Sequence, residues 1–187
     1  MSEFEFLIVF ISIVIGLGVT HLLLGVGRII HNRDQIQVSS VHAVWTANVL
    51  LILVINWWVS FSWGHFAGWS FDIYLVLIAW SISLYMLAVI LYPPDIRGDE
   101  SYAALFERNR RWLFGTFILM NVLDIAQTAL RGDLFDPPYY LPFVLHYIGL
   151  AAIGMVVADR RYQKFWAWYM LISGTTWSLV VRRLLEG

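Results

Sequence analysis

Five polar residues share one face of a single apolar segment, and they are the residues of this chain best placed to do chemistry. At 3.6 residues per turn they fall within roughly a third of the circumference of a helix. An ionisable side chain in hydrocarbon is costly unless water or a polar partner surrounds it, so Asp124 is a functional candidate by default. The five residues are Asn121, Asp124, Gln127, Thr128 and Arg131.

The spacing along this stripe decides which side chains can bond to one another. Gln127 and Thr128 follow Asp124 by about one helical turn and are within its reach, whereas Arg131 lies about two turns away and is not. Two interpretations stay open. The polar groups either clamp neighbouring helices together or line a pathway or ligand site.

Other apolar segments supply polar residues that can join this stripe. Asn56 lies in the second segment and His146 in the fifth. We expect a cavity that opens to the exterior and is lined by Asn56, Asn121, Asp124, Gln127 and His146. For His146 the alternative is a structural histidine that is hydrogen-bonded inside the bundle.

A second titratable group lies towards the opposite membrane surface. Its members are His21, Arg28, His31 and His42. Histidines titrate near neutral pH and can sense or relay protons, although His31 and His42 can equally be solvated. His21 lies deepest, one turn before Gly25, and joins the pathway candidates.

Glycines in the first apolar segment predict close helix packing. We expect Gly16, Gly18, Gly25 and Gly27 on one face against neighbouring helices, and Ile15 and Leu22 on a face towards lipid. This segment would then be the central packing element of a bundle.

Six apolar segments position the candidate residues, and their lengths are typical of transmembrane helices. An amphipathic stretch at about 99–111 is expected to lie at the membrane surface and to lead directly into the fourth helix. The fold class is therefore all-α, a polytopic transmembrane bundle forming one domain over residues 1–187. The predicted spans are about 4–30, 42–63, 71–92, 112–130, 140–158 and 165–181.

The distribution of Lys and Arg predicts the orientation, because these residues resist translocation. One side would hold Arg28, Arg33, Arg97, Arg108, Arg110, Arg111, Arg160, Arg161 and Lys164, and the other only Arg131, Arg182 and Arg183. The first group marks the cytoplasm, so both termini are expected to be extracytoplasmic.

Composition excludes several function classes. A chain that is 60% hydrophobic and 13% charged is not a soluble domain, and a net charge of -1 gives no affinity for nucleic acid. The absence of cysteine excludes thiolate metal and iron–sulfur sites, and no motif of a hydrolase or metal enzyme occurs. We therefore expect no catalytic residue and no metal ligand.

Three short motifs carry a resemblance to known proteins: Gly25-Val-Gly-Arg28, Asn56-Trp-Trp58 and Asn109-Arg-Arg-Trp112. The chain resembles a group of uncharacterised bacterial multi-pass inner-membrane proteins in these motifs. The resemblance implies the bacterial inner membrane, and it carries no activity and no functional residue.

The favoured hypothesis is a small channel or transporter for an ion or small polar solute, forming a homo-oligomer, because an inward polar stripe provides a path. One alternative is a haem-binding redox protein, with His21 paired with His42 or His65 paired with His146 as axial ligands. Another is a sensor or accessory subunit that binds a second membrane protein through its small-residue faces.

Overall fold

The protein is all-helical throughout the residues that its computed structural model describes, which are 3–34, 37, 39–66, 68–94 and 101–185. Six α-helices and one 3-10 helix make up this part of the chain, and it contains no strand. The elements are α1 (Glu3–His31), α2 (Ser40–Val59), η1 (Ser60–His65), α3 (Phe71–Leu91), α4 (Tyr102–Arg131), α5 (Tyr140–Val156) and α6 (Arg160–Leu185).

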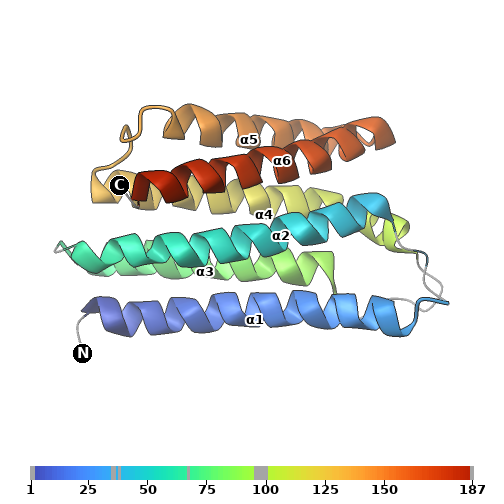
Figure 1. Ribbon diagram of the computed structural model, residues 1–187, viewed down its shortest axis with the longest axis horizontal. Helices are drawn as coiled ribbons and strands as arrows, with labels where there is room; N and C mark the ends of the chain where they lie inside the picture. Colours follow the sequence, from blue (N-terminus) through green and yellow to red (C-terminus); the bar gives the residue numbers. More distant parts are fainter. Residues whose placement is uncertain (1–2, 35–36, 38, 67, 95–100, 186–187) are drawn as a thin grey trace.

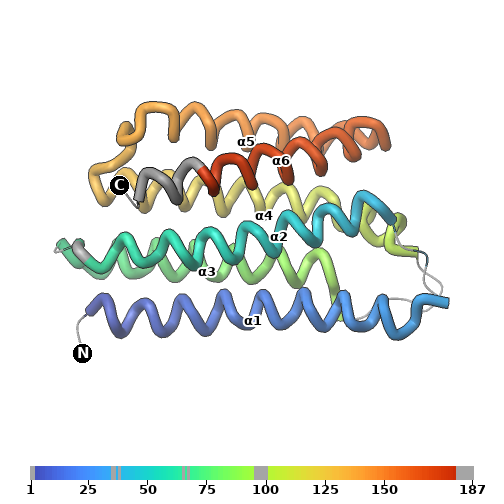
Figure 2. Tube along the Cα trace, viewed as in Figure 1, coloured from blue at the N-terminus to red at the C-terminus, as the bar shows by residue number. Residues whose placement is uncertain are grey.

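The six α-helices run antiparallel along one long axis, so both ends of the chain lie at the same end of the bundle (Figure 1). α3 packs along both α1 and α4, α5 packs along α4, and α6 packs along α2. The Cα trace shows the same arrangement, with α1 at one edge and α5 at the other (Figure 2). The amphipathic stretch before the fourth span and that span itself form the single continuous helix α4.

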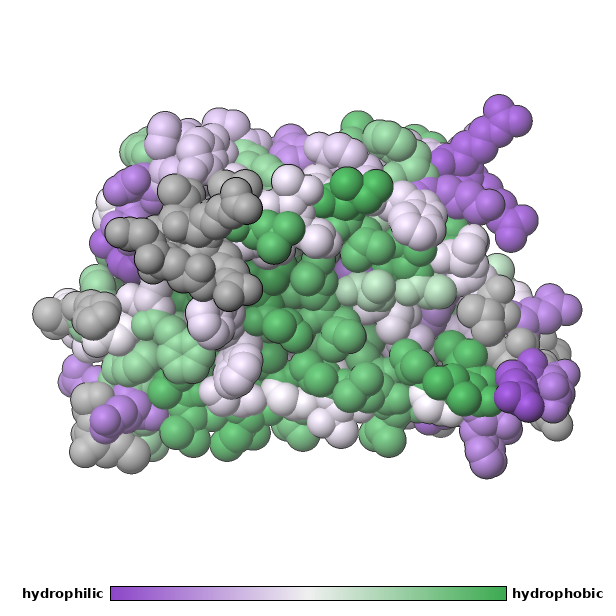
Figure 3. Space-filling view, in the orientation of Figure 1, coloured by the Kyte–Doolittle hydropathy of each residue, from purple (hydrophilic) through white to green (hydrophobic). Residues whose placement is uncertain are grey.

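Four stretches of the described chain are long and apolar enough to cross a membrane: α1, Ser40–Gly64, α3 and α4. α5 is a shorter apolar helix, and α6 begins with basic residues. Hydrophobic residues cover most of the middle of the face in Figure 3, while hydrophilic residues gather towards its ends. These features indicate an integral membrane protein, and the count of six spans stays a prediction.

The basic residues that are described gather as the sequence predicts, because α1 ends where α4 and α6 begin (Figure 1). Arg131 lies at the opposite end, with the two termini. Arg97 and the side chains of Arg182 and Arg183 lie outside the described residues. The extracytoplasmic location of the termini remains a prediction.

The predicted packing face of α1 is wrong. Residues two apart point to nearly opposite sides of a helix, so Gly18 and Gly25 face inward while Gly16 and Gly27 are exposed. An added Cβ at Gly25 would overlap the ring of Tyr92, and one at Gly18 would lie 3.3 Å from the side chain of Leu53, so both inward glycines permit a close approach. The other inward residues of α1 are Leu7, Ile11, Ile15 and Leu22, and the helix lies at the edge of the bundle.

Side chains from three other helices cap the end of α3. This helix stops before two prolines, which cannot continue it, and its last carbonyl groups need partners. The three bonds are His21 Nε2 to the Tyr92 carbonyl (2.6 Å), His42 Nε2 to the Leu91 carbonyl (2.9 Å) and Asn109 Nδ2 to the Ile90 carbonyl (3.1 Å). They fix α1, α2 and α4 against one end of α3.

Candidate functional site

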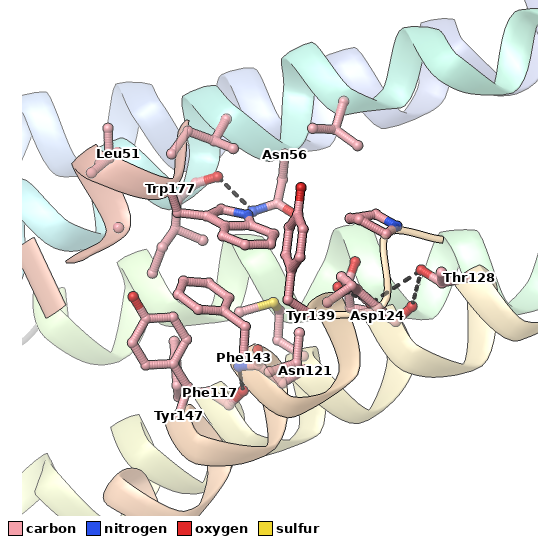
Figure 4. A pocket seen from close by; sticks show the side chains of 18 of the residues that line it. Leu51, Asn56, Phe117, Asn121, Asp124, Thr128, Tyr139, Phe143, Tyr147 and Trp177 are labelled. Atoms are coloured by element: carbon pink, nitrogen blue, oxygen red, sulfur yellow. Dashed lines mark hydrogen bonds between the residues drawn. The ribbon is translucent and has the colours of Figure 1, made fainter. Parts of the chain in front are cut away.

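A cavity of about 670 Å³ lies inside the bundle between α2, α4, α5 and α6. It occupies the half of the bundle where α4 ends and α5 begins, and Figure 4 shows side chains from all four helices around it. Its polar and charged lining residues are Asn48, Asn56, Ser62, Asn121, Asp124, Thr128, Arg131, Asp133 and Asp136.

The cavity exists because the four helices pack as two pairs, α4 with α5 and α2 with α6. Between α5 and α6 the contacts are made mainly by long side chains. Phe143 stacks on Trp177 with ring centroids 4.0 Å apart, and the Tyr147 hydroxyl lies 2.7 Å from Ser173 Oγ. These contacts span the seam between the two pairs and leave space behind it.

Asp124 is the centre of a hydrogen-bonded cluster at the polar end of the cavity. Gln127 Nε2 donates to Asp124 Oδ1 over 2.8 Å, and the Tyr140 hydroxyl donates to Asp124 Oδ2 over 2.7 Å. Thr128 Oγ1 donates to the backbone carbonyl of Asp124 and lies 3.1 Å from the Tyr140 hydroxyl. The carboxylate is thus held in one orientation by partners from two helices, and it lines the cavity rather than facing lipid.

Two asparagines on opposite walls present acceptor oxygens to the cavity. Asn56 and Asn121 each donate Nδ2–H to the carbonyl one turn earlier in their own helix, over 2.8 Å in both cases (Figure 4). Because a carbonyl can only accept, these bonds fix which amide atom is the oxygen. Neither Oδ1 has a partner among the described residues, although Asn121 is only 6% exposed.

Aromatic rings form the wall that faces this polar end. Tyr139 contacts Trp177 edge to face at 5.5 Å, and Phe143 lies between Trp177 and Tyr147. Figure 4 shows the rings of Phe143 and Trp177 against each other in the middle of the cavity. The first residues of α5 therefore provide both the hydroxyl that holds Asp124 and most of the aromatic surface.

The cavity is most exposed at the turn after α4, where its lining residues Asp136 and Tyr139 are exposed, and we call this end the mouth. Gly132 adopts a φ of 91°, the left-handed conformation that ends a helix and that glycine accommodates best. The turn places Asp133 in an ion pair with Arg131, whose guanidinium also donates to Ser62 and lies 5.5 Å from the ring of Trp63. Arg131 therefore links the end of α4 to η1 at the rim.

A plug of buried aromatic rings closes the opposite end. Trp45 lies 5.1 Å from Phe114 and 5.9 Å from Trp166 between ring centroids, and all three side chains are at most 1% exposed. Phe117 contacts Trp166 at 6.2 Å and separates this plug from the cavity. The cavity is thus accessible near the turn after α4 and blocked towards the basic end.

The structure brings four of the seven predicted site residues to the cavity: Asn56, Asn121, Asp124 and Thr128. Gln127 does not line it and instead supports Asp124 from behind. His146 lies one residue from Tyr147 and is rotated towards α6, where its Nε2 lies 3.1 Å from the Tyr169 hydroxyl. His21 lies outside the cavity, in the cap of α3.

Two histidines of the haem alternative are hydrogen-bonded in the cap of α3. His21 and His42 both use Nε2 to donate to backbone carbonyls, and His42 is 0% exposed. The side chain of His65 lies outside the described residues. Haem binding stays a prediction, and a Soret band in the purified protein would be its direct test.

Sequence reasoning missed the contribution of α5 and α6. Tyr140, Phe143 and Tyr147 recur at helical spacing and form an aromatic stripe that could have been found. By itself Tyr140 gives no such signal, because tyrosine is common where an apolar segment meets the membrane interface. No comparable signal marks Trp177.

No group of three or more His, Asp or Glu residues close enough to hold a metal ion occurs in the described part of the chain. What the arrangement offers is a solute cavity with one polar and one aromatic wall. A scan against protein-family models gives no match to the chain, and searches of curated proteins and of solved structures give none either.

Proposed function

We propose that this protein is a membrane transporter that takes up a small solute in the cavity between α2, α4, α5 and α6. The observation that carries the proposal is a cavity of about 670 Å³ that lies within a single chain and is lined at one end by Asp124. Cavities of this size are typical of binding sites for small organic molecules.

The closed end of the cavity favours a transporter over a channel. A channel needs a continuous path, whereas the rings of Trp45, Phe114 and Trp166 block this one on the side away from the mouth. A transporter opens its site to one side at a time. In this proposal the bundle is open near the turn after α4, and movement of the α2–α6 pair against the α4–α5 pair opens the other side.

Access to the cavity from each side of the membrane tests this function. The chain contains no cysteine, so a single introduced thiol has no background. Gly174 lines the cavity, and an added Cβ there meets its nearest neighbour at 3.8 Å, an ordinary contact. Gly174→Cys would be reconstituted in liposomes and treated from either side with a membrane-impermeant cationic methanethiosulfonate.

We expect rapid labelling from the mouth side and slower labelling from the far side, because a transporter exposes its site to both. Gly16→Cys is the control, since Gly16 is exposed near the middle of α1 and a charged reagent does not enter lipid. Labelling of Gly174→Cys from one side only would contradict transport and indicate a receptor. Labelling from neither side would contradict the cavity itself.

A further inference from the structure

We propose that the solute of this cavity is a small organic cation, an ammonium group carried on an apolar or aromatic body. This inference rests on the proposed function and specifies its substrate class. Three independent features of the cavity carry it: the supply of hydrogen-bond acceptors, the balance of charge and the aromatic wall.

Two acceptor oxygens of the lining have no donor among the described residues. The Oδ1 atoms of Asn56 and Asn121 have no partner in the described chain, and one of the two amide hydrogens of each side chain is already used within its own helix. The Tyr140 hydroxyl is also used, since it donates to Asp124. An acceptor oxygen that faces the cavity is matched by a ligand that donates hydrogen bonds.

The charge of the lining is negative. Asp124, Asp133 and Asp136 contribute three carboxylates against the one guanidinium of Arg131, and that guanidinium is ion-paired with Asp133. An anion placed here would face two further carboxylates without a free cation among the described lining residues. A cation would be attracted to them, and most strongly inside the bundle, where screening by water is weak.

The aromatic wall suits the same kind of ligand. The rings of Tyr139, Phe143 and Trp177 offer π faces, which attract ammonium groups and also pack against an apolar body. A bare metal ion or ammonium ion would leave most of the 670 Å³ unfilled. The cavity therefore matches a molecule that has both a charged end, near Asp124, and an apolar end, near Trp177.

Binding of three probes of one shape and different charge tests the substrate class. They are 1-naphthylmethylammonium, the neutral 1-naphthylmethanol and the anionic 1-naphthoate, measured by calorimetry on the full chain in lipid nanodiscs. We expect the cation to bind at least about tenfold more tightly than the alcohol, which corresponds to about 1.4 kcal/mol. The anion should not bind measurably.

Asp124→Asn should remove most of this preference, because the amide keeps the shape of the side chain and loses its charge. Asp72→Asn is the matched control: Asp72 is exposed in the first turn of α3, at the same end of the bundle, and does not line the cavity. An unfolded Asp124 variant would be recognised by its circular dichroism. In that case Asn121→Asp, which adds a carboxylate to the cavity, should strengthen binding of the cation.

The outcomes separate the two proposals. Equal binding of the cation and the alcohol, or tighter binding of the anion, would overturn the cation assignment while leaving a solute cavity in place. A cation preference that Asp124→Asn and Asn121→Asp leave unchanged would also overturn it. If none of the probes bound and Gly174→Cys resisted labelling, both the substrate class and the proposed function would fail.

Discussion

The hydrogen bond between Tyr140 and Asp124 should couple the two residues energetically, and its size can be worked out from the structure. The hydroxyl lies 2.7 Å from Oδ2 and joins α5 to α4. Interhelical hydrogen bonds in membrane proteins contribute about 0.6 kcal/mol on average. A carboxylate acceptor roughly doubles the strength of such a bond. We therefore expect a coupling free energy of about 1.2 kcal/mol.

A double-mutant cycle measures this coupling. Tyr140→Phe, Asp124→Asn and the double variant would be unfolded reversibly with SDS in mixed micelles and followed by circular dichroism. The control cycle replaces Tyr140→Phe by Tyr74→Phe, because no hydrogen bond joins the Tyr74 hydroxyl to another described residue. A coupling below about 0.3 kcal/mol, the usual error of additivity, would show that Tyr140 does not hold the carboxylate.

Two further predictions concern packing and buried charge. Gly25→Ala should lower the free energy of unfolding by about 1–3 kcal/mol, because its Cβ would overlap the ring of Tyr92. Gly27→Ala should change that free energy by no more than about 1 kcal/mol, since nothing lies near its Cβ. Thermal unfolding in detergent would compare them, and equal effects would contradict the assigned face of α1. Arg110→Met should lower the free energy of unfolding by about 2 kcal/mol, because this buried guanidinium caps two carbonyl groups at the end of α5. Arg111 is exposed, so Arg111→Met should lower it by less than about 0.5 kcal/mol. Similar denaturant midpoints for these two variants would refute the capping role.

The arginine cap also shows how the cavity can keep its shape. Arg110 Nη1 donates to the carbonyls of Gly154 and Val157, and Gln163 Nε2 donates to the same two groups. The end of α5 is therefore fixed to both α4 and α6 at the closed side of the bundle. At the mouth, α4 and α6 meet α5 through the side chains that surround the cavity. For the closed side to open as proposed, the two bonds from Gln163 would have to break, while those from Arg110 keep α5 together with α4.

The polar stripe of α4 shows how far local pattern reaches. The helical period places Asn121, Asp124 and Thr128 on one face whatever surrounds the helix, and the structure brings all three to the cavity. The same reasoning could not place His146. The next residue, Tyr147, lines the cavity, whereas His146 points to the seam with α6. The sequence reasoning also placed all four glycines of α1 on one face. This was wrong, because the helical period puts Gly16 and Gly18 on opposite sides.

The sequence by itself determined the helical class, the apolar lengths, the gathering of basic residues at one end and the stripe around Asp124. Each depends on periodicity and composition within one segment, which the order of residues contains directly. Only the tertiary structure decided that α5 and α6 supply the aromatic wall and that His21 and His42 cap α3. Those features depend on which faces of separate helices meet, and that is set by side-chain packing across the whole bundle.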